Sequence, residues 1–303
     1  MPFFDPHLRA PTSAGSAPGR EGHVVVGPLS VLDGTLADAA ALCVAAIAAR
    51  TGARVATANL DFVARARRDR VLRADLATSH LVVADGAPVA WLARLAGGNR
   101  TRRATGVDLI AAICRRASVE APLRAVLYGS APDVAEAAAA RIAAANPGVT
   151  IAAVICPPFA PLTAGQSREY ADRVSAASPG LVLVALGCPR QERFIAEHYA
   201  EAPQAVWIGV GGSFDFYAGK RRRAPAFVGA SGAEWLVRLA QEPRRLWRRY
   251  LLRDLPTLLV VAPGVFFRRM RRSPAAQGGG EMAAAATGPG RPGAEDEVSS
   301  AAL

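Results

Sequence analysis

The sequence is poor in the residues that build disulfide frameworks and metal centres. Its 303 residues include four cysteines and four histidines. The cysteines stand alone in separate apolar segments, without the close pairs of a zinc site or the density of a secreted disulfide scaffold. No histidine or cysteine lies at metal-ligand spacing from another. We therefore expect a reduced, cytoplasmic protein with no structural metal and no cofactor.

Long apolar runs are also missing. None reaches the length of about 18 residues that a membrane-spanning helix needs. Residues 1–22 contain Pro, Gly and Ser but no apolar core like that of a signal peptide, and they predict a disordered leader. The tail, residues 273–303, is rich in Gly, Ala and Ser and is also predicted to be disordered.

Positive charge is concentrated in one part of the chain. The net charge is +11, and 14 Lys or Arg residues lie between Lys220 and Arg272 against three acidic residues, so the rest of the chain is neutral overall. A basic block on a neutral protein indicates an anionic partner surface, either nucleic acid or acidic lipid. Composition does not choose between the two.

Short β-branched runs alternate with longer alanine-rich stretches of helical spacing. This pattern predicts an α/β fold with a Rossmann-like, largely parallel sheet and flanking helices over residues 23–231. The expected strands are residues 23–26, 54–57, 81–84, 125–128, 150–155, 181–186 and 205–210. The expected helices are residues 36–50, 62–77, 106–117, 131–145 and 167–177. From residue 232 to 272 paired arginines alternate with large apolar residues, which predicts a basic helical appendage.

Polar residues follow several of the expected strands, at the sheet edge where open α/β sheets bind ligands. These segments are residues 57–62, 84–86, 187–192 and 209–215. Each has a simpler explanation when taken alone: Thr57 and Asn59 could cap a helix, Asp85 could belong to a turn, and the glycines of 209–212 could permit close packing. Because all four segments fall on one edge, together they indicate a binding site, with glycine amides that can approach a phosphate.

The same segments carry a family resemblance. Residues 57–62, 84–86 and 103–109, followed by 187–192, 209–215, 218–219 and 223–225, resemble the signatures of the WecG/TagA/CpsF glycosyltransferases. Residues 234–244 continue the match, so that the resemblance covers roughly residues 24–255 in order and spacing. Arg102, Ala104, Cys188 and Arg190 depart from the residues that are common in that family.

The resemblance implies an inverting transfer from a UDP-sugar to an undecaprenyl-diphosphate-linked saccharide in cell-surface polysaccharide synthesis. It assigns Asp85 as the base that takes the proton of the acceptor hydroxyl. The sugar could be of the N-acetylmannosamine type, a uronic acid or a hexose. The residues that it implies for substrate binding are Thr57, Asn59, Arg103, Thr105, Gln191, Gly209, Gly211, Gly212 and Asp215.

The leaving diphosphate needs compensating positive charge, and no Asp-X-Asp motif for a metal is present. We therefore expect a metal-independent reaction in which backbone amides of 209–213 and arginines act instead. Arg103 is favoured for this role because it falls inside the signature. Arg221 and Arg222 could also act in this way, but it is nearly as plausible that they only form part of a solvent-exposed face.

The basic appendage fits a helix that lies in a membrane interface, with Trp247 and Tyr250 at headgroup level. Residues 258–267 are too short to span a bilayer but could dip into it. We expect a peripheral protein at the cytoplasmic face of the inner membrane. The arginines expected to contact the anionic membrane or the acceptor diphosphate are Arg238, Arg244, Arg245, Arg248 and Arg249. The sequence leaves open whether the chain forms a homo-oligomer.

Two other functions compete with this interpretation. A nucleic-acid-binding or nucleotide-modifying enzyme would also use an arginine block, but it would not explain the Leu, Val and Phe residues between the arginines. A nicotinamide-dependent dehydrogenase is opposed by the missing Gly-X-Gly-X-X-Gly and acidic ribose ligand. We therefore expect a glycosyltransferase with a lipid-linked acceptor and no nucleic-acid partner.

Overall fold

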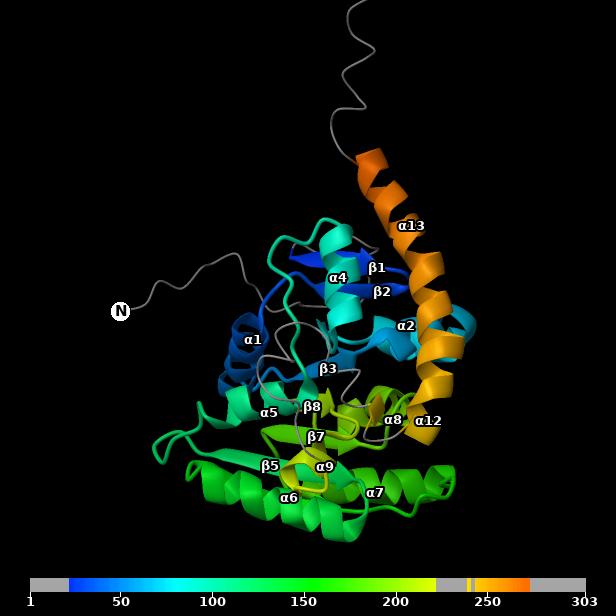
Figure 1. Cartoon of the computed structure of the whole chain (residues 1–303). Coiled ribbons are helices and arrows are strands. Elements are labelled where there is room, and N and C mark those ends of the chain that lie inside the picture. The colour runs from blue at the N-terminus through cyan, green and yellow to red at the C-terminus, as the bar shows by residue number, and fades with distance from the viewer. Residues whose placement is uncertain (1–21, 222–238, 241–242, 273–303) are drawn as a thin grey trace, which may run out of the picture.

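The computed structural model describes residues 22–221, 239–240 and 243–272. Its centre is a six-stranded, fully parallel sheet, which confirms the predicted α/β Rossmann-like fold (Figure 1). The strands are β3 (Ala53–Ala58), β4 (Leu81–Ala84), β5 (Leu123–Gly129), β6 (Val149–Ile155), β7 (Leu181–Ala185) and β8 (Val206–Gly209). Their order across the sheet is β4-β3-β8-β7-β5-β6. Because the strands are parallel, all six end at the same edge.

Helices cover both faces of this sheet. One face packs against α1 (Leu36–Ala48), α5 (Gly106–Cys114), α6 (Pro132–Ala145) and α9 (Ser213–Tyr217). The other packs against α2 (Leu60–Arg68), α3 (Arg70–Ala77), α4 (Ala87–Leu95), α7 (Ala164–Ala176) and α8 (Arg190–His198), the last followed by the 3-10 turn η1 (Tyr199–Glu201). Strand residues alternate between the faces: Val83 joins the first core and Val82 the second. Because the sheet is buried on both faces, the sequences of the strands are nearly continuous apolar runs.

Several elements differ from the sequence prediction. The helix expected over 62–77 is two helices, because the Asp69 carboxylate accepts hydrogen bonds from the backbone N–H groups of Val71 and Leu72 and so starts α3. The strand expected at 23–26, β1 (His23–Val26), is outside the main sheet. It pairs antiparallel with β2 (Leu29–Leu32), which the sequence reading missed, in a separate hairpin. Helices α4 and α8 were also missed.

The C-terminal part of the described chain is one long helical segment. It consists of α12 (Pro243–Arg249), the π-helical turn η2 (Tyr250–Asp254) and α13 (Leu255–Arg272). The 26 residues Leu246–Arg271 are long and apolar enough, by length and composition alone, to cross a membrane. This corrects the expectation that no segment reaches that length. Charged residues interrupt the apolar run in the sequence, but they do not end the helix.

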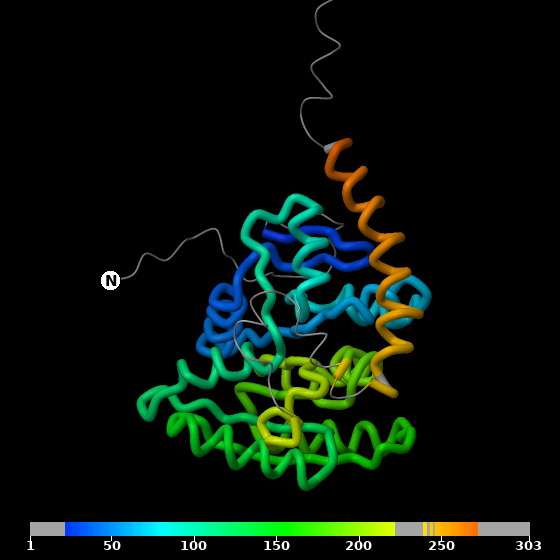
Figure 2. The backbone as a smooth tube through the Cα atoms, in the orientation of Figure 1, coloured from blue at the N-terminus to red at the C-terminus, as the bar shows by residue number. Residues whose placement is uncertain are grey.

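One side of this segment is attached to the α/β core. Leu246, Thr257, Val261 and Val265 are buried, and α13 contacts α2, α4 and β1 (Figures 1 and 2). The buried positions recur at the three- to four-residue spacing of one helix face. The helix is therefore part of the folded unit. Residues 1–21 of the predicted leader, the predicted tail 273–303 and residues 222–238, which include Arg238, lie outside the described residues.

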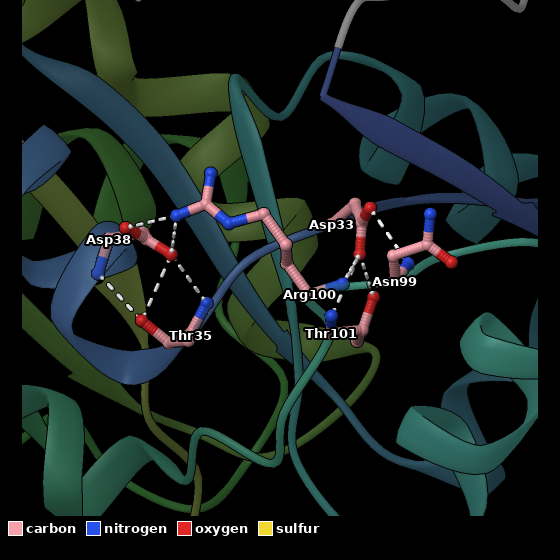
Figure 3. Close-up of polar contacts among 6 residues, drawn as sticks. All are labelled: Asp33, Thr35, Asp38, Asn99, Arg100 and Thr101. Atoms are coloured by element: carbon pink, nitrogen blue, oxygen red, sulfur yellow. Dashed lines mark hydrogen bonds and ion pairs between the residues drawn. The ribbon is translucent and has the colours of Figure 1, made fainter. Parts of the chain in front are cut away.

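A clasp of polar contacts holds the segment between α4 and α5 against the start of α1 (Figure 3). The Asp33 carboxylate accepts hydrogen bonds from the backbone N–H groups of Asn99, Arg100 and Thr101 and from the Thr101 hydroxyl, at 2.7–3.1 Å. Partial burial opposes ionisation, but these bonds hold the pKa of Asp33 below its ordinary value. Arg100 donates in turn to both oxygens of Asp38 at 2.9 Å. The clasp fixes the chain just before it reaches the carboxyl edge of the sheet.

We predict that Asp33→Ala lowers the free energy of unfolding by about 2 kcal/mol, because four donors lose a charged acceptor. Arg100→Ala serves as the control. It should cost less than about 1 kcal/mol, because the Arg100 side chain is 62% exposed and its ion pair is screened by water. Urea unfolding of the three proteins measures both values. Equal losses in the two variants would show that Asp33 has no special part in the clasp.

Candidate active site

A cavity of about 510 Å³ lies at the carboxyl edge of the sheet. It is lined by residues that follow β3, β4, β7 and β8, as the positions of the polar segments predicted, and also by residues that follow β5. Nine of the predicted site residues line it: Thr57, Asn59, Asp85, Thr105, Gln191, Gly211, Gly212, Asp215 and Arg249. The edge thus brings together segments from five strands that are far apart in the sequence.

Asp85 directly follows β4 and faces this cavity as one of its lining residues. Its backbone N–H donates to the carbonyl of Ala58 at 2.9 Å, which extends the pairing of β3 and β4 by one residue. The next residue, Gly86, has φ +126° and turns the chain into α4. A side chain at Gly86 would be strained in this conformation, so the turn that presents Asp85 depends on glycine.

Three predicted binding residues also make structural hydrogen bonds at this edge. The Thr57 hydroxyl donates to the carbonyl of Gly209 at 2.7 Å and so ties β3 to β8. Asn59 caps α2 by accepting from the Asp61 backbone N–H, and Thr105 caps α5 by accepting from that of Asp108. Asn59 therefore does cap a helix, as one interpretation of the sequence expected. Its contact with a substrate stays a prediction, as do those of Thr57 and Thr105.

Gln191 joins two loops beneath the cavity. Its side-chain oxygen accepts from the backbone N–H groups of Gly187, at 3.1 Å, and Gly211, at 3.0 Å. Its side-chain nitrogen donates to Glu192 at 2.7 Å. A Cβ atom at Gly209 would lie only 2.7 Å from that nitrogen, so a side chain at this position would shift the Gln191 amide. Gly209, predicted to bind phosphate, has this packing role in the structure and is absent from the cavity lining.

Positive groups surround the cavity from several directions. The N-termini of α2, α5 and α6 contribute lining residues, and their backbone N–H groups carry partial positive charge. Arg221 also lines the cavity and lies 3.4 Å from the Asp215 carboxylate. Arg249 reaches it from α12. The site combines a carboxylate with fixed positive groups, an arrangement that suits a nucleophile losing a proton and a departing anion.

Some predicted residues lie elsewhere. Arg103 is half-buried in the segment before α5 and does not line the cavity, and neither do Arg244 and Arg248. The side chain of Arg245 and the whole of Arg238 lie outside what the structure describes. The sequence left open whether Arg221 binds the diphosphate or belongs to a solvated face. In the structure Arg221 lines the cavity. Within the described residues no group of three or more His, Cys, Asp or Glu side chains could hold a metal ion.

Sequence reasoning missed the turn between β5 and α6. Ser130, with φ +68°, and Ala131 line the cavity, and α6 begins without a side-chain cap. The signal in the sequence is Gly129-Ser130-Ala131-Pro132, with a glycine at the end of a buried strand and a proline at the first helical position. The helix begins with Pro132, which has no backbone N–H, and the Val134 N–H donates to the carbonyl of Ala131 at 3.0 Å.

The fold and the cavity define an α/β enzyme that can hold an anionic ligand at the carboxyl edge of a parallel sheet. The model of the "Glycosyl transferase WecG/TagA/CpsF family" matches residues 24–273, and the chain belongs to this family of glycosyltransferases.

A relative from Bacillus spizizenii is 34% identical over 200 residues, which are 66% of this chain and 75% of the relative. One from Bacillus subtilis is 32% identical over 209 residues, 67% of this chain and 76% of the relative. Both are N-acetylglucosaminyldiphosphoundecaprenol N-acetyl-beta-D-mannosaminyltransferases.

Glu192 is a buried carboxyl group just behind the cavity. Burial raises its pKa from 4.5 to about 7. Between these values the folded protein binds the Glu192 proton more tightly than the unfolded chain does. Raising the pH through this window therefore lowers the free energy of unfolding.

We predict that Glu192→Gln removes this pH dependence. Relative to the variant, the wild type should lose up to about 3 kcal/mol of unfolding free energy between pH 4.5 and 7. Denaturant unfolding across this range measures the difference, and Glu169→Gln, an exposed change on α7, should keep the wild-type slope. Parallel profiles for wild type and Glu192→Gln would contradict the assignment.

Proposed function

We propose that this chain is an inverting glycosyltransferase that moves a sugar from a UDP-sugar to an undecaprenyl-diphosphate-linked saccharide at the cytoplasmic face of the membrane. The main observation behind the proposal is that Asp85 and several positive groups line the same cavity at the sheet edge. The names of the two Bacillus relatives support a lipid-linked acceptor and a sugar of the N-acetylmannosamine type. The polymer that results is a cell-surface polysaccharide.

In the proposed reaction the acceptor hydroxyl attacks the anomeric carbon from the face opposite the leaving UDP. Asp85 accepts the hydroxyl proton as the new bond forms and so acts as the general base. The bond from the anomeric carbon to UDP breaks, and negative charge grows on the diphosphate. The helix N-termini, the amide of Gly212, and Arg221 and Arg249 stabilise that charge. No metal ion is assigned a part, and metal independence stays a prediction.

The exposed side of the C-terminal helical segment supports attachment to a membrane. Large apolar residues lie on the side that faces away from the core: Trp247, Leu251, Leu252, Leu255, Leu259, Val260, Phe266, Phe267 and Met270. We call this set the apolar stripe. Arg268, Arg269 and Arg271 lie near its C-terminal end and are exposed. A helix with a buried face, an apolar outer face and flanking arginines suits a bilayer interface better than a nucleic-acid groove.

The core attachment of α13 favours peripheral binding over a membrane span. Val261 and Val265 pack among residues of α2 and α4, so the middle of the helix cannot be surrounded by lipid without leaving the core. Only the outer side is available to acyl chains. The protein would then lie on the surface, with the cavity close to the headgroups where the acceptor diphosphate is found.

We predict that Asp85→Asn lowers turnover by about 10² or more without unfolding the protein, because it keeps the shape of the side chain but removes the proton acceptor. Turnover is measured with UDP-N-acetylmannosamine and an undecaprenyl-diphosphate-linked N-acetylglucosamine, the acceptor that the names of the relatives indicate. Asp172→Asn, an exposed change on α7, should leave turnover unchanged. Near-normal turnover of folded Asp85→Asn would remove Asp85 from the mechanism.

The apolar stripe gives a second prediction. Leu252→Glu combined with Leu259→Glu should weaken binding to anionic liposomes several-fold, because two side chains that are 67% and 66% exposed would bring negative charge into the interface. Co-sedimentation measures binding, and Val119→Glu, a 76% exposed change in the loop after α5, is the control. High salt should release the wild type only partly, since apolar insertion resists screening. Unchanged binding of the double variant would place the membrane contact elsewhere.

A further inference from the structure

Two buried acids and three partly exposed arginines lie together where the C-terminal helical segment meets α2. The Asp61 side chain, 9% exposed, accepts from Arg253 Nη1 at 2.7 Å and from Arg65 Nε at 2.8 Å. Burial would raise the pKa of Asp61, but the hydrogen bond from Arg253 and the charges of Arg249 and Arg65 hold it below its ordinary value. Asp61 is therefore a charged anchor for the turn η2, which carries Arg253.

The π-helical turn η2 creates a second contact that a regular helix would not allow. Arg249 Nε and Asp254 Oδ2 lie 3.5 Å apart, although these residues are five positions apart in the sequence. In an α-helix, residues five apart point about 140° away from each other around the axis. The wider π-helical turn, with its i to i+5 hydrogen bonds, brings such residues onto one side. Asp254 itself is buried, so its carboxylate is shielded from water.

Arg249 connects this charged group to the cavity. Its side chain is 28% exposed and lines the cavity, as does Asp61. Both carboxylates act on Arg249 electrostatically, because its charge lowers the pKa of Asp61 and opposes the rise in that of Asp254. The C-terminal helical segment thus supplies a cation to a cavity that the sheet edge otherwise builds.

We infer that Asp254 is a positioning residue: through the turn η2, which Asp61 and Arg253 fasten to α2, it holds Arg249 at the cavity, where the guanidinium binds a substrate diphosphate. This inference rests on the proposed function and goes beyond it by assigning the residue that orders the cation. An arginine already held in one geometry loses little freedom when it binds its ligand. A planar guanidinium also matches the oxygens of a diphosphate.

A double-mutant cycle with Arg249→Gln and Asp254→Asn tests the inference. The readout is calorimetric binding of inorganic pyrophosphate to the full-length protein at pH 8. Burial raises the pKa of Asp254 to about 6, so Asp254 is charged at this pH. We expect Arg249→Gln to weaken binding about 10-fold, in line with the loss of one charge-assisted contact. Asp254→Asn should weaken binding several-fold when Arg249 is present and should have no further effect in Arg249→Gln.

Two controls separate positioning from a general structural role. Arg168→Gln, which removes a 71% exposed arginine of α7, should leave pyrophosphate binding unchanged. Hydrogen exchange of the α13 amides should be the same in Asp254→Asn as in the wild type, so that loss of affinity does not come from an undocked helix. Additive losses across the cycle, increased exchange of α13 in Asp254→Asn, or failure of the wild type to bind pyrophosphate would each overturn the inference.

Steady-state kinetics then identify the source of the diphosphate and test the proposed function separately. A rise in KM for the UDP-sugar in Arg249→Gln and Asp254→Asn would assign Arg249 to the donor. A rise in KM for the lipid-linked acceptor would assign it to the acceptor, and either result supports the inference. Absence of transfer by the wild type would reject the proposed function. The double-mutant cycle with pyrophosphate would still show whether Asp254 positions Arg249.

Discussion

The parallel alignment of the six strands is the constraint on which the site depends. Because every strand ends at the same edge, the segments after β3, β4, β5, β7 and β8 meet at one cavity although they are spread from Thr57 to Asp215. Parallel strands also require crossover helices, and several of these begin at that edge. The carboxylate of Asp85 and the backbone N–H groups of helix N-termini thus come together through the topology of the sheet. The side chains then add specific bonds, such as those of Gln191 to Gly187 and Gly211.

The strands and the site edge could be predicted from the sequence because their signal is local. Residues 81–84 were predicted as a strand and form β4 with the same bounds, since four apolar residues are followed at once by Asp85-Gly86. The start of α3 was missed because the helical spacing of apolar residues continues through Asp69. That Asp69 starts a new helix is shown only by its hydrogen bonds from the backbone N–H groups of Val71 and Leu72. The β1–β2 hairpin was missed for another reason: strand β1 could be recognised, but its pairing with Leu29–Leu32 depends on packing against α4 and α13.

For the site, the sequence indicated which segments meet but not what each side chain does there. Gly209 was predicted to bind phosphate; it does not line the cavity and leaves room for Gln191, but its contact with a phosphate stays a prediction. Arg103 was favoured over Arg221 because it lies in a family signature, but Arg221 is the one that lines the cavity. The role proposed for Arg249 depends on a π-helical turn and on Asp61, 188 residues earlier in the chain. Such contacts are set by tertiary structure, and residue spacing does not predict them.

The central claim is that Asp85 and the surrounding positive groups perform an inverting transfer to a lipid-linked saccharide. The most direct test is to incubate the purified full-length protein with UDP-N-acetylmannosamine, in which the sugar is α-linked, and undecaprenyl-diphosphate-linked N-acetylglucosamine. The anomeric configuration of the product is then determined by NMR. The account predicts a disaccharide with a β linkage, because attack from the face opposite UDP inverts the anomeric carbon. An α-linked product, or no transfer from any member of a panel of UDP-sugars, would contradict it.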